Sequence, residues 1–390
     1  MMFDLVLTGG RVVDPEQNLD ATLDVCFANG KIAYVGKSTE HQAKTVRDVS
    51  GLVVTPGLID LHTHVYWGGT SMGVDASSIA LRSGTTTLVD AGSAGPGNFL
   101  GFRHHIIEKS PVRILPYLNI CFAGIFAYSR AVMVGECSDL RLINPSECVR
   151  VIRENRDLIV GVKARVGSVA GGNSGIAPLE LALEVANEVG LPVMAHIDNP
   201  PPSRKDILSL LRPGDVLTHC CKPFPNSPVR ADGSVWEDVL LARERGVYFD
   251  VAHGGASFGF AVARNLLKQG FKPDVISSDV HMLNVDGPVF DLMVTLSKFF
   301  CLGMDLTSVI RAATSAPAAA LRRADLGSLK EGFQGDATIF EISSGEFEYK
   351  DSLGEVLRGK QRFRPRAIVK AGTWIDSMNS LNDLERTRTN

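Results

Sequence analysis

Eight short apolar runs alternate with helix-like segments through the middle of the chain, and this alternation restricts the fold more than any other feature. The runs cover residues 58–61, 86–89, 112–115, 158–162, 192–195, 216–218, 247–251 and 275–278. Between two of them, residues 178–190 begin with Pro, contain helix formers and end with Gly, which indicates a helix. Buried strands joined by helical crossovers over about 250 residues are typical of a closed (β/α)8 barrel. We therefore predict an α/β fold with a TIM barrel; a doubly wound open sheet is the alternative, but no G-x-G-x-x-G follows the first run.

Both ends of the chain have the pattern of short strands. In residues 3–55, Asn29-Gly30 separates two strand-like stretches and is a strong hairpin signal. Further strand-like stretches lie at 336–342 and 366–374. Neither end has enough strands to bury a sheet face alone, so we expect the two termini to form one small β-sandwich. The predicted domains are residues 1–55 (N-terminal part of the sandwich), 56–330 (barrel) and 331–390 (C-terminal part of the sandwich and a polar tail).

Composition argues against several classes of function. The net charge of −3 provides no basic surface for nucleic acid. No apolar segment has the length of a membrane span, and the first residues do not form a signal peptide. The seven cysteines form no C-x-x-C pair and are too sparse for a disulfide framework. We expect a cytoplasmic protein that acts on a small molecule, with no nucleic-acid or membrane partner, and base rates favour a homo-oligomer.

Side chains that bind metals stand at the carboxyl ends of the runs. His62 and His64 follow the first run, and two residues of one strand separated by one position point the same way. The remaining candidates, which follow the fourth, fifth, sixth and eighth runs, are Lys163, His196, His219 and Asp279. In a barrel all of these positions meet at one rim, where the active sites of this fold are built. The sequence therefore predicts a metal centre at that rim.

The residue types indicate a pair of divalent ions. Imidazole and carboxylate are good ligands for zinc and its neighbours, and zinc is the default for nitrogen and oxygen ligands. Two such ions about 3.5–4 Å apart can activate a water and clamp a reacting oxygen. An ammonium would be repelled there, so Lys163 fits only if its amine reacts with carbon dioxide to a carbamate that bridges the metals. Taken singly, Lys163 is more often an ion-pair residue, and Asp279 is as often a helix N-cap as a ligand; the ordered set favours metal binding.

At this point the chain resembles the binuclear branch of the amidohydrolase superfamily. The resemblance is carried by Pro-Gly-Leu-Ile-Asp-Leu-His-Thr-His at 56–64, the lysine after the fourth run, the single histidines after the fifth and sixth, and the aspartate after the eighth. It implies that His62, His64 and Asp279 bind the more buried metal, that His196 and His219 bind the more exposed one, and that carboxylated Lys163 bridges them. It also implies hydrolysis by an activated water, with Asp279 as the general base that later protonates the leaving group.

Four further residues are candidates for contact with the substrate. Arg165 lies two residues past Lys163, where it either binds a substrate carboxylate or forms a structural ion pair. His253 and His281 stand near strand ends, where they either touch substrate or support the ligands. Tyr66 follows the metal motif and forms either an apolar wall of the pocket or part of the core.

The choice of reaction depends on Tyr66 and Lys163. Members of the dihydroorotase subgroup usually have an arginine where this chain has Tyr66, which argues against ring opening of dihydroorotate. Deaminases of the superfamily usually lack the bridging lysine. The resemblance is greatest to deacetylases, so we predict removal of an acyl group from a carboxylate-bearing N-acyl amino acid or O-acetyl hydroxy acid. The alternatives are a cyclic amide hydrolase of the dihydroorotase or hydantoinase type and, more remotely, a non-catalytic scaffold protein, although all six candidate ligands are present.

Overall fold

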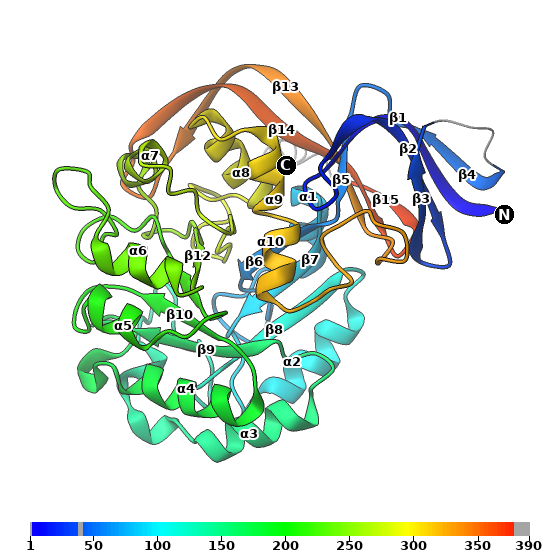
Figure 1. Cartoon of the computed structure of the whole chain (residues 1–390). Helices are drawn as coiled ribbons and strands as arrows, with labels where there is room; N and C mark the ends of the chain where they lie inside the picture. Colours follow the sequence, from blue (N-terminus) through cyan, green and yellow to red (C-terminus); the bar gives the residue numbers. More distant parts are fainter. Residues whose placement is uncertain (1, 38–41, 378–390) are drawn as a thin grey trace, which may run out of the picture.

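The computed structural model describes residues 2–37 and 42–377, so nearly all of the predicted polar tail lies outside the described residues (Figure 1). Seven parallel strands form one sheet in the order β12-β11-β10-β9-β8-β7-β6. These strands are β6 (Leu58–Thr63), β7 (Thr85–Ala91), β8 (Arg113–Asn119), β9 (Gly161–Val166), β10 (Val193–Ile197), β11 (Val216–Thr218) and β12 (Tyr248–Asp250). They correspond to the first seven apolar runs of the sequence.

The eighth run, together with the two residues after it (275–280, called the eighth segment), closes the sheet into a barrel. Val275 forms a parallel bridge with Asp250 of β12, and Val280 forms one with Thr63 of β6. Two buried serine–carboxylate pairs fasten this segment on its two sides: Ser277 Oγ donates to Asp250 Oδ1 at 2.5 Å, and Ser278 Oγ donates to Asp60 Oδ2 at 2.5 Å. The prediction of a TIM barrel is therefore confirmed, with its last strand reduced to single bridges.

Helices surround the barrel, and local capping explains several of their ends. For example, α4 has Pro178 in its first turn and ends at Gly190, whose φ of +68° suits glycine. The helices are α1 (Ala76–Ser83), α2 (Phe99–His105), α3 (Pro145–Glu154), α4 (Ala177–Val189), α5 (Arg204–Leu210), α6 (Glu237–Glu244), α7 (Phe260–Lys268), α8 (Leu292–Cys301), α9 (Leu306–Arg311) and α10 (Ser315–Ala320), with 3-10 turns at Ile107–Lys109, Glu136–Ser138, Leu140–Leu142 and Gly172–Ser174. None of the helices among the described residues is long and apolar enough to span a membrane.

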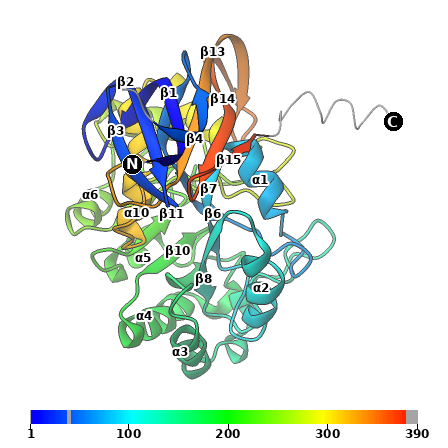
Figure 2. The same cartoon turned by 90° about the vertical axis from the view of Figure 1, so that its right-hand side faces the viewer.

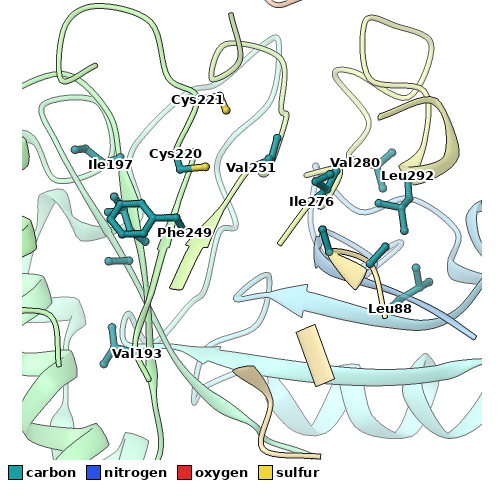
Figure 3. Packing of buried hydrophobic residues seen from close by; sticks show 14 of the residues in the cluster. Leu88, Val193, Ile197, Cys220, Cys221, Phe249, Val251, Ile276, Val280 and Leu292 are labelled. Carbon is teal, nitrogen blue, oxygen red and sulfur yellow. The ribbon is translucent and has the colours of Figure 1, made fainter. Parts of the chain in front are cut away.

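Apolar side chains of strands and helices meet in a continuous core between the sheet and the helix layer. Figure 3 shows part of this core, in which Phe249 of β12 lies close to Cys220 and Ile197. All three are at most 2% exposed. Burial of this kind supplies the main driving force for folding and leaves the polar residues at the strand ends as the exceptions that need an explanation.

The two ends of the chain meet in a second, mixed sheet beside the barrel (Figure 2). Its strands are β1 (Phe3–Asp14), β2 (Leu19–Ala28), β3 (Lys31–Gly36), β4 (Ala43–Asp48), β5 (Val53–Pro56), β13 (Ala337–Lys350), β14 (Val356–Lys370) and β15 (Thr373–Asp376). Asn29-Gly30 forms the predicted hairpin turn, with φ of +53° and +71°. The antiparallel pairing of β13 with β5 joins the C-terminal strands to the N-terminal ones.

This sheet bends around its own apolar core. The register of β1 shifts between Leu7 and Gly10, so its first half pairs with β4 and its second half with β5. Buried side chains from both ends of the chain, among them Phe27, Val54 and Ile339, pack together inside the bend. The arrangement fits the predicted sandwich built from both termini.

The buried carboxylate of Asp336 fixes the junction between the two units. Its Oδ2 lies 2.6 Å from Arg113 Nη1 at the start of β8, and its Oδ1 accepts from the Ala371 backbone at 2.9 Å and from Lys370 Nζ at 3.2 Å. Asp336 is 5% exposed. Two half-buried cations and one backbone donor therefore share a single carboxyl group.

Replacing Asp336 with Ala should lower the free energy of unfolding by about 3 kcal/mol, because it leaves the Arg113 guanidinium without its buried partner. Urea unfolding followed by circular dichroism measures this change. The control is Glu348→Ala, which breaks an exposed ion pair with Arg358 and should cost less than about 0.5 kcal/mol. Equal losses in the two variants would contradict the role given to Asp336.

Candidate metal centre

His62, His64 and Asp279 converge where the eighth segment meets β6. Asp279 Oδ1 lies 3.4 Å from His62 Nε2 and 3.3 Å from His64 Nε2. The backbone places them, since the Asp279 amide donates to the His62 carbonyl at 2.7 Å. All three side chains are buried, and one ligand atom from each lies within 4.8 Å of the others. This spacing suits a single metal ion held by two imidazoles and a carboxylate.

Lys163 reaches the same point from β9. Its side chain is fully buried, and its Nζ lies 3.5 Å from His62 Nε2. The apolar run predicted at 158–162 begins the strand too early, because Leu158 and Ile159 bond to Asn155 in the turn after α3 and β9 starts only at Gly161. Lys163 thus lies within the strand rather than after it. Burial lowers the pKa of Lys163 to about 7, which favours the neutral, nucleophilic form of its amine.

Gly92 provides the space that the lysine stem occupies. Its φ is +85°, and a Cβ at this position would lie 2.7 Å from both Cβ and Cγ of Lys163. Glycine is therefore needed at the end of β7 for two reasons, a left-handed backbone and the close approach of a neighbouring side chain.

His196 and His219 form the second half of the cluster. His196 lies on β10, and His219 follows β11 with a φ of +68°. His219 Nε2 is 2.7 Å from His196 Nδ1, and its ring centre is 5.4 Å from that of His62. The structure therefore brings all six predicted ligands together, in two groups joined by His62 and Lys163.

The electrostatics of the cluster fit a metal centre. Burial lowers the pKa of each of the four imidazoles, to about 3 for His64, so the rings are neutral lone-pair donors at neutral pH. Four neutral imidazoles, a carboxylate and a lysine amine packed this closely have too few hydrogens to satisfy one another. Divalent cations suit donors of this chemistry. His62, His64 and Asp279 lie on one side of the cluster and His196 and His219 on the other.

Outer partners orient the imidazole rings, and the sequence reasoning did not identify them. His64 Nδ1 lies 2.9 Å from Ser93 Oγ, and His219 Nδ1 donates to the Ala252 carbonyl at 2.8 Å. These two hydrogen bonds fix which nitrogen is available to a metal. His62 Nδ1 faces Asp250 Oδ2 at 3.7 Å, which is longer than a hydrogen bond, and burial raises the pKa of Asp250 to about 8. The one signal for them in the sequence is a charged residue within an apolar run, as at Asp250.

Arg165 lies on the same face of β9 as Lys163 and forms a buried ion pair. Its Nη1 is 3.1 Å from Glu136 Oε2, and its guanidinium lies over the Tyr128 ring at 4.7 Å. Arg165 therefore forms a structural ion pair, which was the alternative to binding a substrate carboxylate. Its contact with substrate stays a prediction.

His253, His281 and Tyr66 differ in their surroundings. His281 is close to the cluster, with its ring centre 6.0 Å from that of His64. His253 is fully buried, and both of its ring nitrogens have partners within the chain. Tyr66 stacks on Phe102 at 4.7 Å and is 9% exposed, as its core alternative requires. Their roles toward substrate stay predictions.

Comparisons with known proteins agree with this geometry. The sequence profile of the Amidohydrolase family matches residues 53–375. A protein named deacetylase from Agrobacterium fabrum is 37% identical over 342 residues, which cover 87% of this chain and 83% of that protein. A crystal structure of an adenine deaminase superposes with a TM-score of 0.90 at 31% identity, covering 96% of this chain and 100% of the other. A crystal structure of a dihydroorotase has a TM-score of 0.87 at 36% identity and covers 96% and 99%.

Removing one ligand from either half should release metal. His64→Ala and His219→Ala should each weaken binding of a divalent ion by about tenfold or more, since even outer partners contribute that much. Elemental analysis of purified protein measures the bound metal. The control, His104→Ala, removes an exposed histidine that bonds to Glu108 and should leave the metal content unchanged. Wild-type protein without a stoichiometric transition metal would contradict the site.

The space at Gly92 gives a second test. Gly92→Ala should displace Lys163 and reduce the bound metal, because the new Cβ would overlap the lysine stem. Gly190→Ala is the control: this residue also has a positive φ of +68°, but a Cβ there would meet nothing within 4 Å. It should cost about 1 kcal/mol of stability and leave the metal content intact. Equal metal loss in the two variants would show that backbone strain alone explains the effect.

Proposed function

This chain belongs to the amidohydrolase family and is a metal-dependent hydrolase, and within that class we propose that it cleaves an amide or ester bond to remove an acetyl group from a small carboxylate-bearing substrate. The substrate is an N-acyl amino acid or an O-acetyl hydroxy acid. The observation that carries the proposal is the convergence of His62, His64 and Asp279 with Lys163 and the His196–His219 pair at one rim. Relatives named deacetylases support the choice of acyl group.

We assign the metal site to two divalent ions, with zinc as the default. His62, His64 and Asp279 would hold one ion, His196 and His219 would hold the other, and a carboxylated Lys163 would supply an oxygen ligand to each. When bound, such ions lower the pKa of a water to about 7 and polarise a substrate carbonyl. The burial of Lys163 supports carboxylation, because the neutral amine is the form that reacts with carbon dioxide.

Asp279 is the proposed group for proton transfer. Its Oδ1 faces the imidazoles of His62 and His64, and the residue is 8% exposed. A carboxylate in this position accepts a proton from the attacking water and then donates it to the leaving nitrogen or oxygen. The other members of the cluster are four neutral imidazoles and Lys163, so Asp279 supplies its one carboxylate side chain.

Arg165 is the proposed group that binds the substrate carboxylate. It shares a strand face with Lys163, and its pairing with Glu136 and stacking on Tyr128 hold the guanidinium in one orientation. His281, beside His64, is the second candidate for contact with the substrate. His253 acts on the site through the loop after β12, which it holds in place.

A cyclic amide hydrolase is the alternative within the family. The similarity to a solved dihydroorotase, at 36% identity, is the reason to test this alternative. Against it, the Tyr66 hydroxyl donates to the Asn98 carbonyl at 3.2 Å and its ring is buried, so this position provides no cation for a substrate carboxylate. Deamination, suggested by the solved adenine deaminase, is the other outcome to be tested.

We also propose the division at residues 55 and 331, a homo-oligomeric state and a cytoplasmic location. All seven cysteines are free, and six of them are buried, which supports a reducing compartment. The pairing of β5 with β13 supports these domain boundaries.

A substrate panel tests the proposed function. Metal-loaded enzyme should hydrolyse N-acetyl-D- or L-amino acids or O-acetyl hydroxy acids, and should be much less active on dihydroorotate, hydantoins and adenine. Activity confined to cyclic ureides or imides would move the assignment to the alternative, and activity confined to adenine would make the protein a deaminase.

The carboxylate contact is tested with the paired variant Arg165→Met/Glu136→Gln, which removes both charges and so leaves none unpaired. It should raise KM for the carboxylate substrate about tenfold, because a charged hydrogen bond is lost, and leave KM for the corresponding primary amide nearly unchanged. The same increase for both substrates would exclude Arg165 from carboxylate binding.

A further inference from the structure

Lys298 is a fully buried lysine that the metal centre does not use. It lies on α8, and its Nζ has three partners: His253 Nε2 at 2.7 Å, the Pro288 carbonyl at 2.8 Å and the Lys350 carbonyl at 2.8 Å. An ammonium group has three hydrogens, and here each of them has an acceptor. The side chain thereby joins α8 to two loops of the barrel rim and to β13.

The hydrogen bonds of His253 fix the direction of this contact. Its Nδ1 lies 2.9 Å from the Gly254 carbonyl, which can only accept, so Nδ1 carries the ring hydrogen. Because burial holds the pKa of His253 well below its usual value, the ring is neutral and Nε2 accepts from Lys298. The ring also stacks on Phe258 at 4.3 Å. Lys298 therefore orients His253, and His253 in turn holds the loop that follows β12.

That loop lies directly against Asp279. The Gly254 amide donates to the Ser278 carbonyl at 3.1 Å, and a Cβ at Gly254 would lie 2.4 Å from Asp279 Oδ2. Asp279 itself has a φ of +51°, an unfavourable backbone conformation for a residue other than glycine. Asp279 therefore needs contacts with neighbouring residues to keep this strained backbone conformation.

The turn between β13 and β14 holds the same loop from the other side. Ser352 Oγ donates to the Gly254 carbonyl at 3.1 Å, and the Ser352 amide donates to the Phe258 carbonyl at 3.0 Å. Asp351 Oδ2 accepts from the Phe260 amide at 2.9 Å. Figure 1 shows β13 and β14 passing over α8 to reach this rim beside α7. The C-terminal segment thus contacts the rim loop through backbone and side chain.

We propose that Lys298 and the turn at 350–352 are positioning elements for catalysis: they hold the loop 253–258 against Asp279, so that the C-terminal sheet contributes to the geometry of the active site. The inference rests on the proposed function in one respect, namely that Asp279 transfers the proton. Lys298 and Ser352 touch neither substrate nor metal ligands and act through His253 and Gly254.

The test compares three variants of the full-length, metal-loaded protein. Lys298→Met keeps the volume of the side chain and removes its donors, and Ser352→Ala removes one hydroxyl from a half-buried residue that tolerates the change. Lys370→Met is the matched control, since Lys370 bonds to Asp336 at the junction of the two units, at the amino ends of the barrel strands. Hydrogen–deuterium exchange measures the loop, and kcat and KM are measured on the best substrate of the panel.

Lys298→Met and Ser352→Ala should each speed exchange of the amides at 253–260 about tenfold, and the control should leave it unchanged. The Lys298 and Ser352 variants should also lower kcat about tenfold and change KM less than about twofold, because the general base Asp279 is displaced while the contacts with substrate remain. Unchanged exchange in both variants would overturn the inference, and faster exchange with unchanged kcat would overturn its catalytic part. The exchange measurement needs no substrate, so failure of the acylated panel would overturn the proposed substrate class alone.

Discussion

Closure of the barrel is the constraint on which the rest of the structure depends. The eighth segment fits between β12 and β6 because Ser277 and Ser278 bind the buried carboxylates of Asp250 and Asp60. Burial raises the pKa of Asp60 to about 7, so these contacts form in a region of low polarity where an unpaired polar group is expensive. Closure places Asp279 beside His62 and His64, more than two hundred positions away in sequence. Without it, Asp279 would not meet the two histidines.

The rim contains strained backbone conformations and buried polar side chains, both of which are energetically unfavourable. His219 and Asp279 have positive φ values, and four imidazoles and a lysine are buried close together. These costs are typical of functional sites, where the surrounding fold imposes a geometry that the local sequence does not prefer. A tightly packed core around the barrel supplies the stability that the rim lacks.

Similar proteins bear the names deacetylase, dihydroorotase and adenine deaminase, and they share one family and one barrel. Of the residues proposed to separate these reactions, Lys163 belongs to the candidate metal centre, whereas Arg165 and Tyr66 are not among its ligands. In this chain the loop after β12 is held by the turn between β13 and β14, so the second sheet contacts the rim of the barrel.

The order of apolar runs and polar residues in the sequence was sufficient to predict the barrel, the hairpin at Asn29-Gly30 and the six candidate ligands, because strand periodicity and the common rim of a parallel barrel depend on local pattern and simple topology. The sequence did not reveal the start of β9 at Gly161, since Leu158 and Ile159 are equally apolar in a turn or a strand. Nor did it reveal the partners of the rings, such as Ser93 and Asp250, or the contact of Lys298 with His253. Those depend on distances between segments far apart in the chain, and only the packed tertiary structure determines them.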